Sequence, residues 1–448
     1  MKILLLNPIN SHVKVAMNKD LAGGMGTLSN FGNSILSKII SLVKKRNVCI
    51  PILSYAYLQS IFLQQEHFVE YIENLKNILP KKSYDLILIY GSIVDYKYEN
   101  SVYKNLKKKF KNSKIGFFGS FPSIRPDLFP SDFVIQGEAE SYFLYEFKDI
   151  MNIKNLKGII KVKKFVDMND LPTPNFNGFP IKKYSYFPAI REKPLLTLQA
   201  SRGCPCSCAY YCPYGMIQGS KYRTRNASKI IEDIKELIKK YKIKGLQFRD
   251  PIFGLDKNQL FQFIELMKKN NIKIKFGIET RLDLLDKEIL KKLFEIGLSN
   301  INIGIETVDD NIAKINKRKL TEIKHQEEII NYCNKIGIKV SAFYILGFIN
   351  DTKDNIKRTI EYAIKLNTNV AQFCISCPYP GTGFYNEIKS KGLLLEKDFE
   401  KFNSVELVFK HNNLSKKKIL KLQQHAFKKY YFRIGYLINF IKWQIKEF

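Results

Sequence analysis

The sequence predicts an α/β protein in which a doubly wound, Rossmann-like domain precedes a partial (β/α)6 barrel and a C-terminal helical tail. Short apolar runs that end in glycine recur through the first 150 residues, and a strand-then-helix pattern repeats six times between residues 193 and 388. Parallel strands that are buried on both faces give apolar runs of this kind. The length of 448 residues also suggests more than one domain.

Residues 1–150 are predicted to form the first domain. Its strand candidates lie at 3–6, 85–90, 115–118 and 133–135, and its helix candidates at 35–43 and 68–79. Small or polar residues follow three of these strands, at Gly91-Ser92, Gly119-Ser120 and Gly137-Glu138. Ligands of doubly wound sheets lie outside such strand ends, where glycine permits close backbone approach. The alternative is that these glycines only make tight turns.

Residues 151–192 are predicted to be a connector that crosses between two domains. Prolines and turn formers crowd this segment and argue against regular elements. The barrel is expected over residues 193–388. Its strand candidates are 195–200, 245–248, 274–278, 300–305, 339–346 and 370–376, and its helix candidates are 230–241, 261–267, 289–294, 322–336 and 353–366. Asp256 and Asp286 suit helix N-caps, and right-handed crossovers would curl the sheet.

Residues 389–448 are predicted to be a helical extension. From residue 414 onward the chain is helical in pattern, basic and rich in aromatic residues. We expect its aromatic face to pack on the barrel, because aromatic residues contribute most when buried. The alternative is a helix that lies on an anionic membrane surface as a peripheral contact.

The formal net charge of +31 raises the question of a nucleic-acid partner. The excess is mostly lysine spread through every segment, and no arginine-rich stripe or nucleic-acid motif concentrates it, so we expect no such partner. The apolar start is too short for a signal peptide, and no run is long and apolar enough for a membrane-spanning helix. Eight cysteines, four of them clustered, favour a reducing cytoplasm and metal chemistry.

Four cysteines lie within nine residues, at Cys204, Cys206, Cys208 and Cys212, directly after the first barrel strand. A structural zinc site normally takes its ligands as two separated pairs, and no second pair is well placed here. An iron–sulfur cluster takes thiolates from one tight loop. If three cysteines bind such a cluster, one iron stays open to a substrate or cofactor.

The loop resembles that of the radical S-adenosylmethionine (SAM) superfamily, in the class that carries an N-terminal cobalamin-binding-like domain. The loop motif is Ala200-Ser-Arg-Gly-Cys204-Pro-x-x-Cys208, followed by Tyr211-Cys212. Further matching motifs are Gly119-Ser-Phe-Pro122-Ser123, Gly137-Glu138-Ala-Glu140, Tyr222-Arg-x-Arg225, Phe248-Arg-Asp250-Pro-x-Phe253, Thr280-Arg281-x-Asp283, Gly304-Ile-Glu306-Thr307, Ile345-Leu-Gly347-Phe, Pro378-Tyr-Pro-Gly-Thr382 and Tyr430-Tyr-Phe-Arg433. These motifs span nearly the whole chain.

The resemblance implies that Cys204, Cys208 and Cys212 hold a [4Fe-4S] cluster whose open iron binds SAM. It also implies SAM contacts for Tyr211, Asp250, Arg281 and Glu306. For the last three the alternative is a salt-bridged residue at the barrel rim. Two departures stand out: the spacing is Cys-x3-Cys-x3-Cys instead of Cys-x3-Cys-x2-Cys, and Cys206 replaces a frequent aromatic residue.

The resemblance further implies cobalamin as a cofactor of the first domain, lined by Ser92, Gly119, Ser120 and Gly137. The signature Asp-x-His-x-x-Gly of many cobalamin domains is absent, since His12 lacks the aspartate and the glycine. The domain therefore either binds cobalamin without a protein histidine or has lost it.

The expected reaction is reductive cleavage of SAM to a 5′-deoxyadenosyl radical, followed by methylation or rearrangement of a small-molecule or lipid-like substrate. The expected partners are that substrate and an electron donor such as flavodoxin or ferredoxin. No residue of the sequence identifies the substrate or a catalytic acid or base. One alternative is a radical RNA-modifying enzyme, although Cys49 is the only N-terminal cysteine where methylthiotransferases carry three. Another is a basic nucleic-acid-binding protein with a structural metal site.

Overall fold

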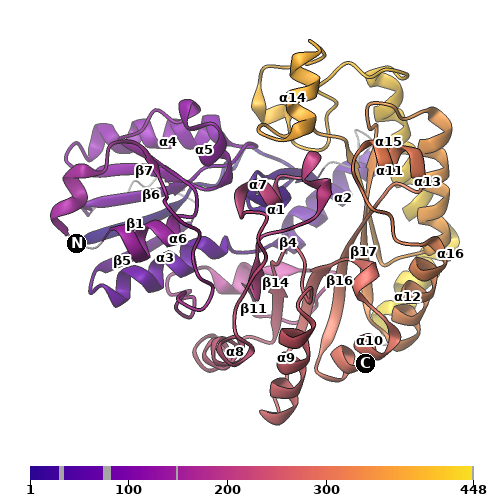
Figure 1. Ribbon diagram of the computed structural model, residues 1–448, viewed down its shortest axis with the longest axis horizontal. Coiled ribbons are helices and arrows are strands. Elements are labelled where there is room, and N and C mark those ends of the chain that lie inside the picture. The colour runs from indigo at the N-terminus through magenta and orange to yellow at the C-terminus, as the bar shows by residue number, and fades with distance from the viewer. Residues whose placement is uncertain (30–34, 74–81, 148–149, 446–448) are drawn as a thin grey trace.

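The computed structural model describes residues 1–448 except 30–34, 74–81, 148–149 and 446–448. Within those residues, two six-stranded sheets form the cores of two halves of the molecule (Figure 1). Both sheets are parallel throughout. The predicted fold class is therefore confirmed.

The first sheet has the strand order β5-β1-β6-β7-β8-β9. Its strands are β1 (Lys2–Asn7), β5 (Phe68–Glu73), β6 (Leu86–Tyr90), β7 (Lys114–Phe118), β8 (Phe133–Gln136) and β9 (Gly158–Lys161). Helices α4 (Tyr96–Lys109) and α5 (Ser120–Ile124) lie on one side of it, and α3 (Leu53–Gln64) and α6 (Ala139–Ser141) lie on the other (Figure 1). The four predicted strands are confirmed.

Two elements of this half contradict the sequence predictions. Phe68–Glu73 forms an edge strand, not the start of a helix over 68–79, and 74–79 lie outside the described residues. Strand β1 offers a free edge to which another strand can pair. Tyr71 is buried, and its ring stacks on that of Phe179 with 3.6 Å between the ring centroids. Both contacts favour a strand here, although the spacing of apolar residues suggested a helix. The connector also contributes a regular element, because β9 pairs with β8.

The second sheet has the order β11-β14-β15-β16-β17-β18 and leaves β11 and β18 unpaired with each other, so the barrel is partial. Its strands are β11 (Leu195–Leu198), β14 (Gly245–Phe248), β15 (Lys275–Thr280), β16 (Leu298–Glu306), β17 (Lys339–Leu346) and β18 (Val370–Ile375). All six strand predictions are confirmed.

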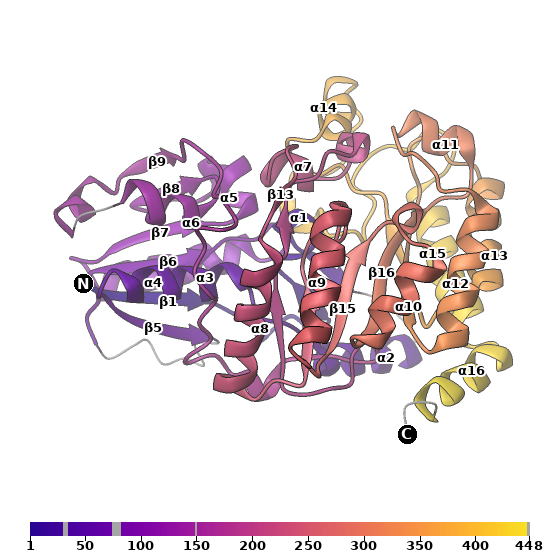
Figure 2. The same ribbon diagram turned by 60° about the horizontal axis from the view of Figure 1, so that its bottom comes forward.

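Helices cover the outside of this sheet (Figure 2). They are α8 (Ala227–Tyr241), α9 (Lys257–Lys269), α10 (Lys287–Glu295), α12 (Ile323–Ile336) and α13 (Lys353–Leu366), with the shorter α7 (Tyr214–Ile217), α11 (Asp310–Ile315) and α14 (Gly383–Ser390) at the mouth. The Asp256 carboxylate accepts a hydrogen bond from the Gln259 amide, and that of Asp286 accepts one from the Ile289 amide. Both predicted N-caps are confirmed.

The segment between β1 and α3 leaves the first sheet and reaches the barrel. It forms β2 (Ala16–Asn18), α1 (Leu21–Gly24), β3 (Thr27–Ser29), α2 (Ile35–Asn47) and β4 (Val48–Cys49). Strand β4 pairs with β10 (Ser185–Tyr186) of the connector. The Lys44 ammonium on α2 donates to the Gln372 amide oxygen on β18 at 2.8 Å. This segment therefore reaches the last strand of the barrel sheet.

The tail forms α15 (Lys416–Tyr431) and α16 (Ile434–Ile445). The Tyr431 hydroxyl donates to the Ala371 carbonyl (2.8 Å), and that of Tyr436 donates to the Asn369 carbonyl (2.8 Å). Phe427 packs edge-on against Phe373 of β18 at 5.4 Å between centroids. The predicted packing of the aromatic face on the barrel is confirmed. None of the described helices is long and apolar enough to span a bilayer.

Candidate active site

The four clustered cysteines lie in a loop at the carboxyl end of the first barrel strand. After β11 the chain forms β12 (Ser201–Arg202), which pairs with β13 (Arg223–Thr224) and leads into the loop. Gly203 has a φ of 84°, and a Cβ there would lie 2.0 Å from the Lys221 carbonyl oxygen. The entry into the loop therefore requires glycine.

Asp250, just after β14, holds the chain that enters this loop. Its carboxylate accepts hydrogen bonds from the Ala200 amide (3.0 Å) and the Ser201 hydroxyl (2.6 Å). Burial raises the pKa of Asp250 to about 7, although these hydrogen bonds lower it. The structure thus gives Asp250 a positioning role for the loop, and its contact with SAM stays a prediction.

Asp250 predicts a pH dependence of stability. Its ordinary pKa is 3.8, so between about pH 4 and 7 the folded protein retains a proton that the unfolded chain releases. Its contribution to stability is therefore complete below pH 4 and is lost as the pH rises to 7, by at most about 1.4 kcal/mol per pH unit. As the pH rises from 4.5 to 7.5, we expect the melting temperature of the wild type to fall relative to that of Asp250→Asn. An unchanged difference between the two proteins would contradict this.

The thiols of the loop lie together. The Cys206 sulfur accepts hydrogen bonds from Cys204 and Cys208, which lowers the pKa of Cys206 and raises the pKa values of the other two. The Arg281 guanidinium also approaches the Cys206 sulfur at 3.6 Å. The Cys212 amide donates to the Cys208 carbonyl at 2.9 Å and turns the chain back toward the group. Arg281 thus lies at the loop and also pairs with Asp283 at 2.8 Å, and its contact with SAM stays a prediction.

This donor set fits an iron–sulfur cluster better than a single ion. Among the described residues, no three His, Cys, Asp or Glu side chains form a ready site for one metal ion. In a [4Fe-4S] cluster the protein thiolates bind different irons, so their sulfur atoms do not converge on one point. Four thiols on one short loop, beside the cationic Arg281, provide that chemistry. Cys204, Cys208 and Cys212 stay the predicted ligands, and Cys206 lies between two of them.

Tyr211 and Glu306 meet on the other side of the loop. The Tyr211 ring is buried and packs edge-on against Phe348 at 5.5 Å. Glu306 has a φ of 66° at a register shift of β16, a strained position of the kind found at functional sites. Burial raises the pKa of Glu306, opposed by Arg318. Arg318 also hydrogen-bonds Cys208 and donates to the Gly304 carbonyl.

Arg318 is a site residue that sequence reasoning missed. It lies in the basic run Asn316-Lys-Arg318-Lys after α11, where neither spacing nor a strand end distinguishes it. Its role becomes visible only when the fold brings the run against Glu306 and Cys208. Together Arg318 and Arg281 place positive charge on two sides of the cysteine loop, which suits a cluster held by anionic thiolates.

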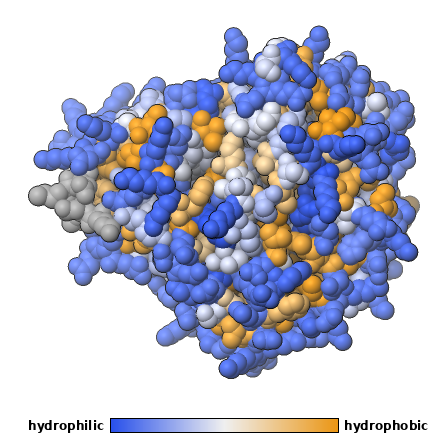
Figure 3. All heavy atoms as spheres, viewed as in Figure 1, coloured by the Kyte–Doolittle hydropathy of each residue, from blue (hydrophilic) through white to orange (hydrophobic). Residues whose placement is uncertain are grey.

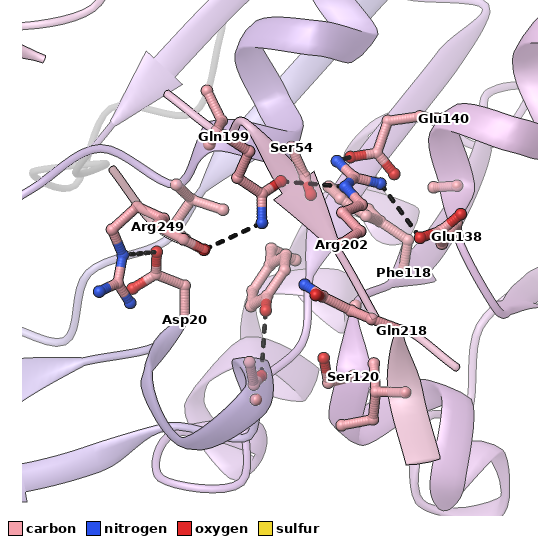
Figure 4. Close-up of a pocket in the computed structure, with 18 of the residues that line it drawn as sticks. Asp20, Ser54, Phe118, Ser120, Glu138, Glu140, Gln199, Arg202, Gln218 and Arg249 are labelled. Carbon is pink, nitrogen blue, oxygen red and sulfur yellow. Dashed lines mark hydrogen bonds and ion pairs between the residues drawn. The ribbon is translucent and has the colours of Figure 1, made fainter. Parts of the chain in front are cut away.

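A pocket lies between the first sheet and this loop (Figure 4). Its first wall comes from the carboxyl ends of β6, β7 and β8, and its second wall from the barrel. The lining includes Tyr90, Gly119, Ser120 and Gly137 from the first half, and Gln199, Arg202, Tyr214, Gln218 and Arg249 from the second. Tyr214 follows Cys212 by two residues, so the pocket adjoins the loop.

Three of the four residues predicted to line a cobalamin site are in this wall. Gly119 and Gly137 have φ of 116° and 120°, and a Cβ at Gly119 would lie 2.9 Å from the Tyr90 ring. Ser92 is not among the lining residues: its hydroxyl donates to Glu99 at 2.8 Å, and that carboxylate also accepts from Lys19. Ser92 is therefore part of a buried hydrogen-bonded cluster with Glu99 and Lys19, and it does not line the pocket as predicted.

The pocket offers chemistry that suits an amide-rich ligand such as cobalamin. The Gln218 side-chain oxygen lines it and is buried without a hydrogen-bond partner among the described residues. A buried oxygen without a partner is costly, so a ligand donor would stabilise it. At Gly119 and Gly137 the backbone itself lines that wall, with no side chain between it and a ligand. These observations fit the group that the sequence motifs imply.

Buried ion pairs join the two walls. Arg202 of β12 pairs with Glu140 at 2.9 Å and with Glu138 at 3.3 Å, and all three side chains are at least nine-tenths buried. Arg223 reaches Glu138 at 2.8 Å. On the opposite side of the pocket Arg249 pairs with Glu279 and lies 3.7 Å from Asp20 of the segment that enters from the first half. These contacts fix the first sheet against the barrel around the pocket.

The chain resembles known radical enzymes in sequence. Residues 198–363 match the family model of the Radical SAM superfamily. An uncharacterized methyltransferase of Pyrococcus horikoshii is 26% identical over 87% of this chain and 89% of its own length. The bacteriochlorophyllide d C-8(2)-methyltransferase of Chlorobaculum tepidum is 24% identical over 73% of each chain.

Solved structures share the fold. The radical SAM methyltransferase TsrM from Kitasatospora setae, solved with cobalamin and a [4Fe-4S] cluster, has a TM-score of 0.65 and 12% identity over 87% of this chain and 75% of its own. The cobalamin-dependent radical enzyme OxsB has a TM-score of 0.68 and 15% identity over 95% of this chain and 66% of its own. Residues 198–363 therefore form a domain that matches the radical SAM superfamily, and the two-sheet architecture is the fold of these two cobalamin-dependent enzymes.

Proposed function

We propose that this enzyme is a cobalamin-dependent methyltransferase that acts on an unactivated carbon or phosphorus centre of a small organic substrate. The pocket between the two sheets carries the proposal, because it joins the glycine-rich strand ends of the first half to the cysteine loop of the second. The relatives named as methyltransferases support the same reaction class.

The site's own residues would bind and orient the reactants. As a radical SAM enzyme, the chain takes a [4Fe-4S] cluster and SAM, for which we propose Cys204, Cys208 and Cys212 as ligands and Tyr211 and Glu306 as SAM contacts. When bound, these groups supply a 5′-deoxyadenosyl radical, and cobalamin supplies a carrier for the methyl group. The buried Tyr211 and Phe348 rings would keep water from the reacting atoms.

Further parts of the proposal concern partners and domains. We propose a small electron-transfer protein, such as flavodoxin or ferredoxin, as the reductant. We propose domains at residues 1–150, 151–192, 193–388 and 389–448, and β9 of the second segment pairs into the first sheet.

An RNA-modifying radical enzyme is the alternative function. Figure 3 shows the visible face covered mostly by hydrophilic side chains with small apolar areas between them, and no arginine-rich sequence run concentrates the basic charge.

Anaerobic reconstitution tests the proposal. The purified chain would receive iron, sulfide and hydroxocobalamin, and then reductant and SAM. We expect iron and sulfide near four each per chain, cobalamin retained after gel filtration, and formation of both 5′-deoxyadenosine and S-adenosylhomocysteine. Formation of 5′-deoxyadenosine without retained cobalamin would refute the methyltransferase proposal and leave the superfamily assignment intact.

Gly119→Ala should separate cobalamin binding from cluster binding. The substitution forces a Cβ to 2.9 Å from the Tyr90 ring at a φ that disfavours any side chain. We expect loss of most retained cobalamin, read from its visible absorbance, with iron content unchanged. Gly435→Ala, where a Cβ would meet nothing within 4 Å, is the matched control. Equal cobalamin retention in both variants would contradict the placement.

A further inference from the structure

Two helices leave aliphatic side chains in solvent on one side of the molecule. These side chains are each 47–76% exposed: Ile39, Leu42 and Val43 on α2, and Ile434, Leu437, Ile438 and Ile441 on α16. On α16 their spacing of three and four residues places them on one stripe, and α2 repeats that spacing. We call these seven side chains the aliphatic face. Exposed apolar side chains gathered on a helix stripe in this way mark an interaction site.

The opposite side of α16 is already occupied. Tyr436 is buried there and packs against Tyr431 at 5.0 Å and Tyr430 at 5.4 Å between ring centroids. A helix that is apolar on all sides is expected to be covered on all sides. Packing on the barrel covers only one side of α16, so its exposed stripe calls for a second apolar environment.

The charged side chains on the helices that carry the aliphatic face are all basic. Neither α2 nor α16 contains an aspartate or glutamate, and the same holds for α15. Exposed cations flank the stripes, at Lys38, Lys45 and Arg46 on α2 and at Lys442 on α16. Aliphatic stripes on helices whose charged residues are all basic suit the headgroup region of an anionic bilayer, where apolar burial and attraction to lipid charge act together.

The placement of the two helices allows simultaneous contact. In Figure 2, α2 and α16 both lie along the lower edge of the molecule, while α7, which follows the cysteine loop, lies toward the upper edge. We propose that the aliphatic face docks this enzyme on the surface of an anionic lipid bilayer, with α2 and α16 lying in the interface. This docking is independent of the reaction proposed above and leaves the barrel mouth facing away from the lipid.

The chain contains a built-in reporter for this docking. Trp443 is its only tryptophan and lies on α16, half-buried against Tyr436 at 5.8 Å. Full-length protein would be mixed with vesicles of phosphatidylcholine alone or with phosphatidylglycerol added. We expect flotation and a blue shift of Trp443 emission only with the anionic vesicles. Binding should weaken as salt is raised, because ionic attraction is screened.

Variants distinguish binding through the aliphatic face from nonspecific adsorption to vesicles. Leu437→Glu with Ile441→Glu, and separately Leu42→Glu, should weaken vesicle binding roughly tenfold or more. Leu395→Glu, at a 60% exposed leucine outside both helices, is the matched control and should bind like wild type. Unchanged melting temperatures would show that all variants fold. Failure of wild type to float with anionic vesicles, or equal binding by the α16 variant, overturns the proposal. So does a dimer by light scattering that Leu437→Glu dissociates, because a second copy would then cover the face.

Discussion

Cys208→Ser is expected to remove the cluster and all formation of 5′-deoxyadenosine. A serine hydroxyl stays protonated where a thiolate ligates, so one iron would lose its protein ligand. Cys208 is also the thiol that Arg318 hydrogen-bonds, beside the buried Tyr211, so its loss disturbs the part of the loop that faces Glu306. Iron and sulfide analysis with the absorbance near 400 nm, after anaerobic reconstitution, measures the first effect, and product analysis the second.

Two further variants make this result specific. Cys49→Ser, a cysteine of β4 away from the loop, should keep iron and product at the wild-type level. Cys206→Ala should also keep its iron, because we assign the three ligands to Cys204, Cys208 and Cys212. Collapse of the iron content in Cys206→Ala would show instead that Cys206 is a ligand. The hydrogen bonds that Cys206 accepts from both neighbours make this the most informative single change in the loop.

Arg202→Met is expected to destabilise the whole molecule. Removal of the guanidinium leaves the carboxylates of Glu138 and Glu140 buried, and breaking a buried pair in this way costs about 3–5 kcal/mol. We expect a melting temperature several degrees lower and easier proteolysis within the connector. Thermal melting followed by circular dichroism, with limited trypsin digestion, measures both effects.

An exposed ion pair supplies the control for Arg202. Lys292 pairs with Glu288 one helical turn away on α10, where 39% of the Lys292 side chain and 75% of the Glu288 side chain are exposed. Lys292→Met should change stability by no more than about 0.5 kcal/mol. Similar losses in the two variants would show that the contacts between the two halves are not what Arg202 contributes.

The barrel could be predicted from the sequence because each of its units is locally consistent. The 4–9-residue apolar strands alternate with helices that begin at caps such as Asp256 and Asp286, and every strand was found where the pattern placed it. The cysteine loop was equally readable, because four soft ligands in nine residues have few other uses. Local patterns were sufficient here because neighbouring elements in the chain are also neighbours in space.

The rest depends on contacts between distant residues. Strand β5 forms because β1 offers a free edge, and β9 forms because β8 does. Arg202 and Glu140 are in contact although 62 positions separate them in the sequence, and 110 positions separate Arg318 from Cys208. Nothing within a short window of sequence distinguishes these residues from the many other basic side chains. Helix α3 was missed because nine of its twelve residues are buried, which removes the amphipathic pattern.

The path of residues 8–50 has a consequence for how this enzyme can be divided. The chain begins in the first sheet, crosses to the barrel for β2, α2 and β4, and returns for α3 before it crosses again. A fragment that starts at residue 193 would lack α2, whose Lys44 contacts Gln372 on β18, and Asp20, which lies 3.7 Å from Arg249 at the pocket. The two halves are therefore interwoven and not exchangeable modules, and chimaeras with related enzymes should keep residues 8–50 and the barrel from the same parent.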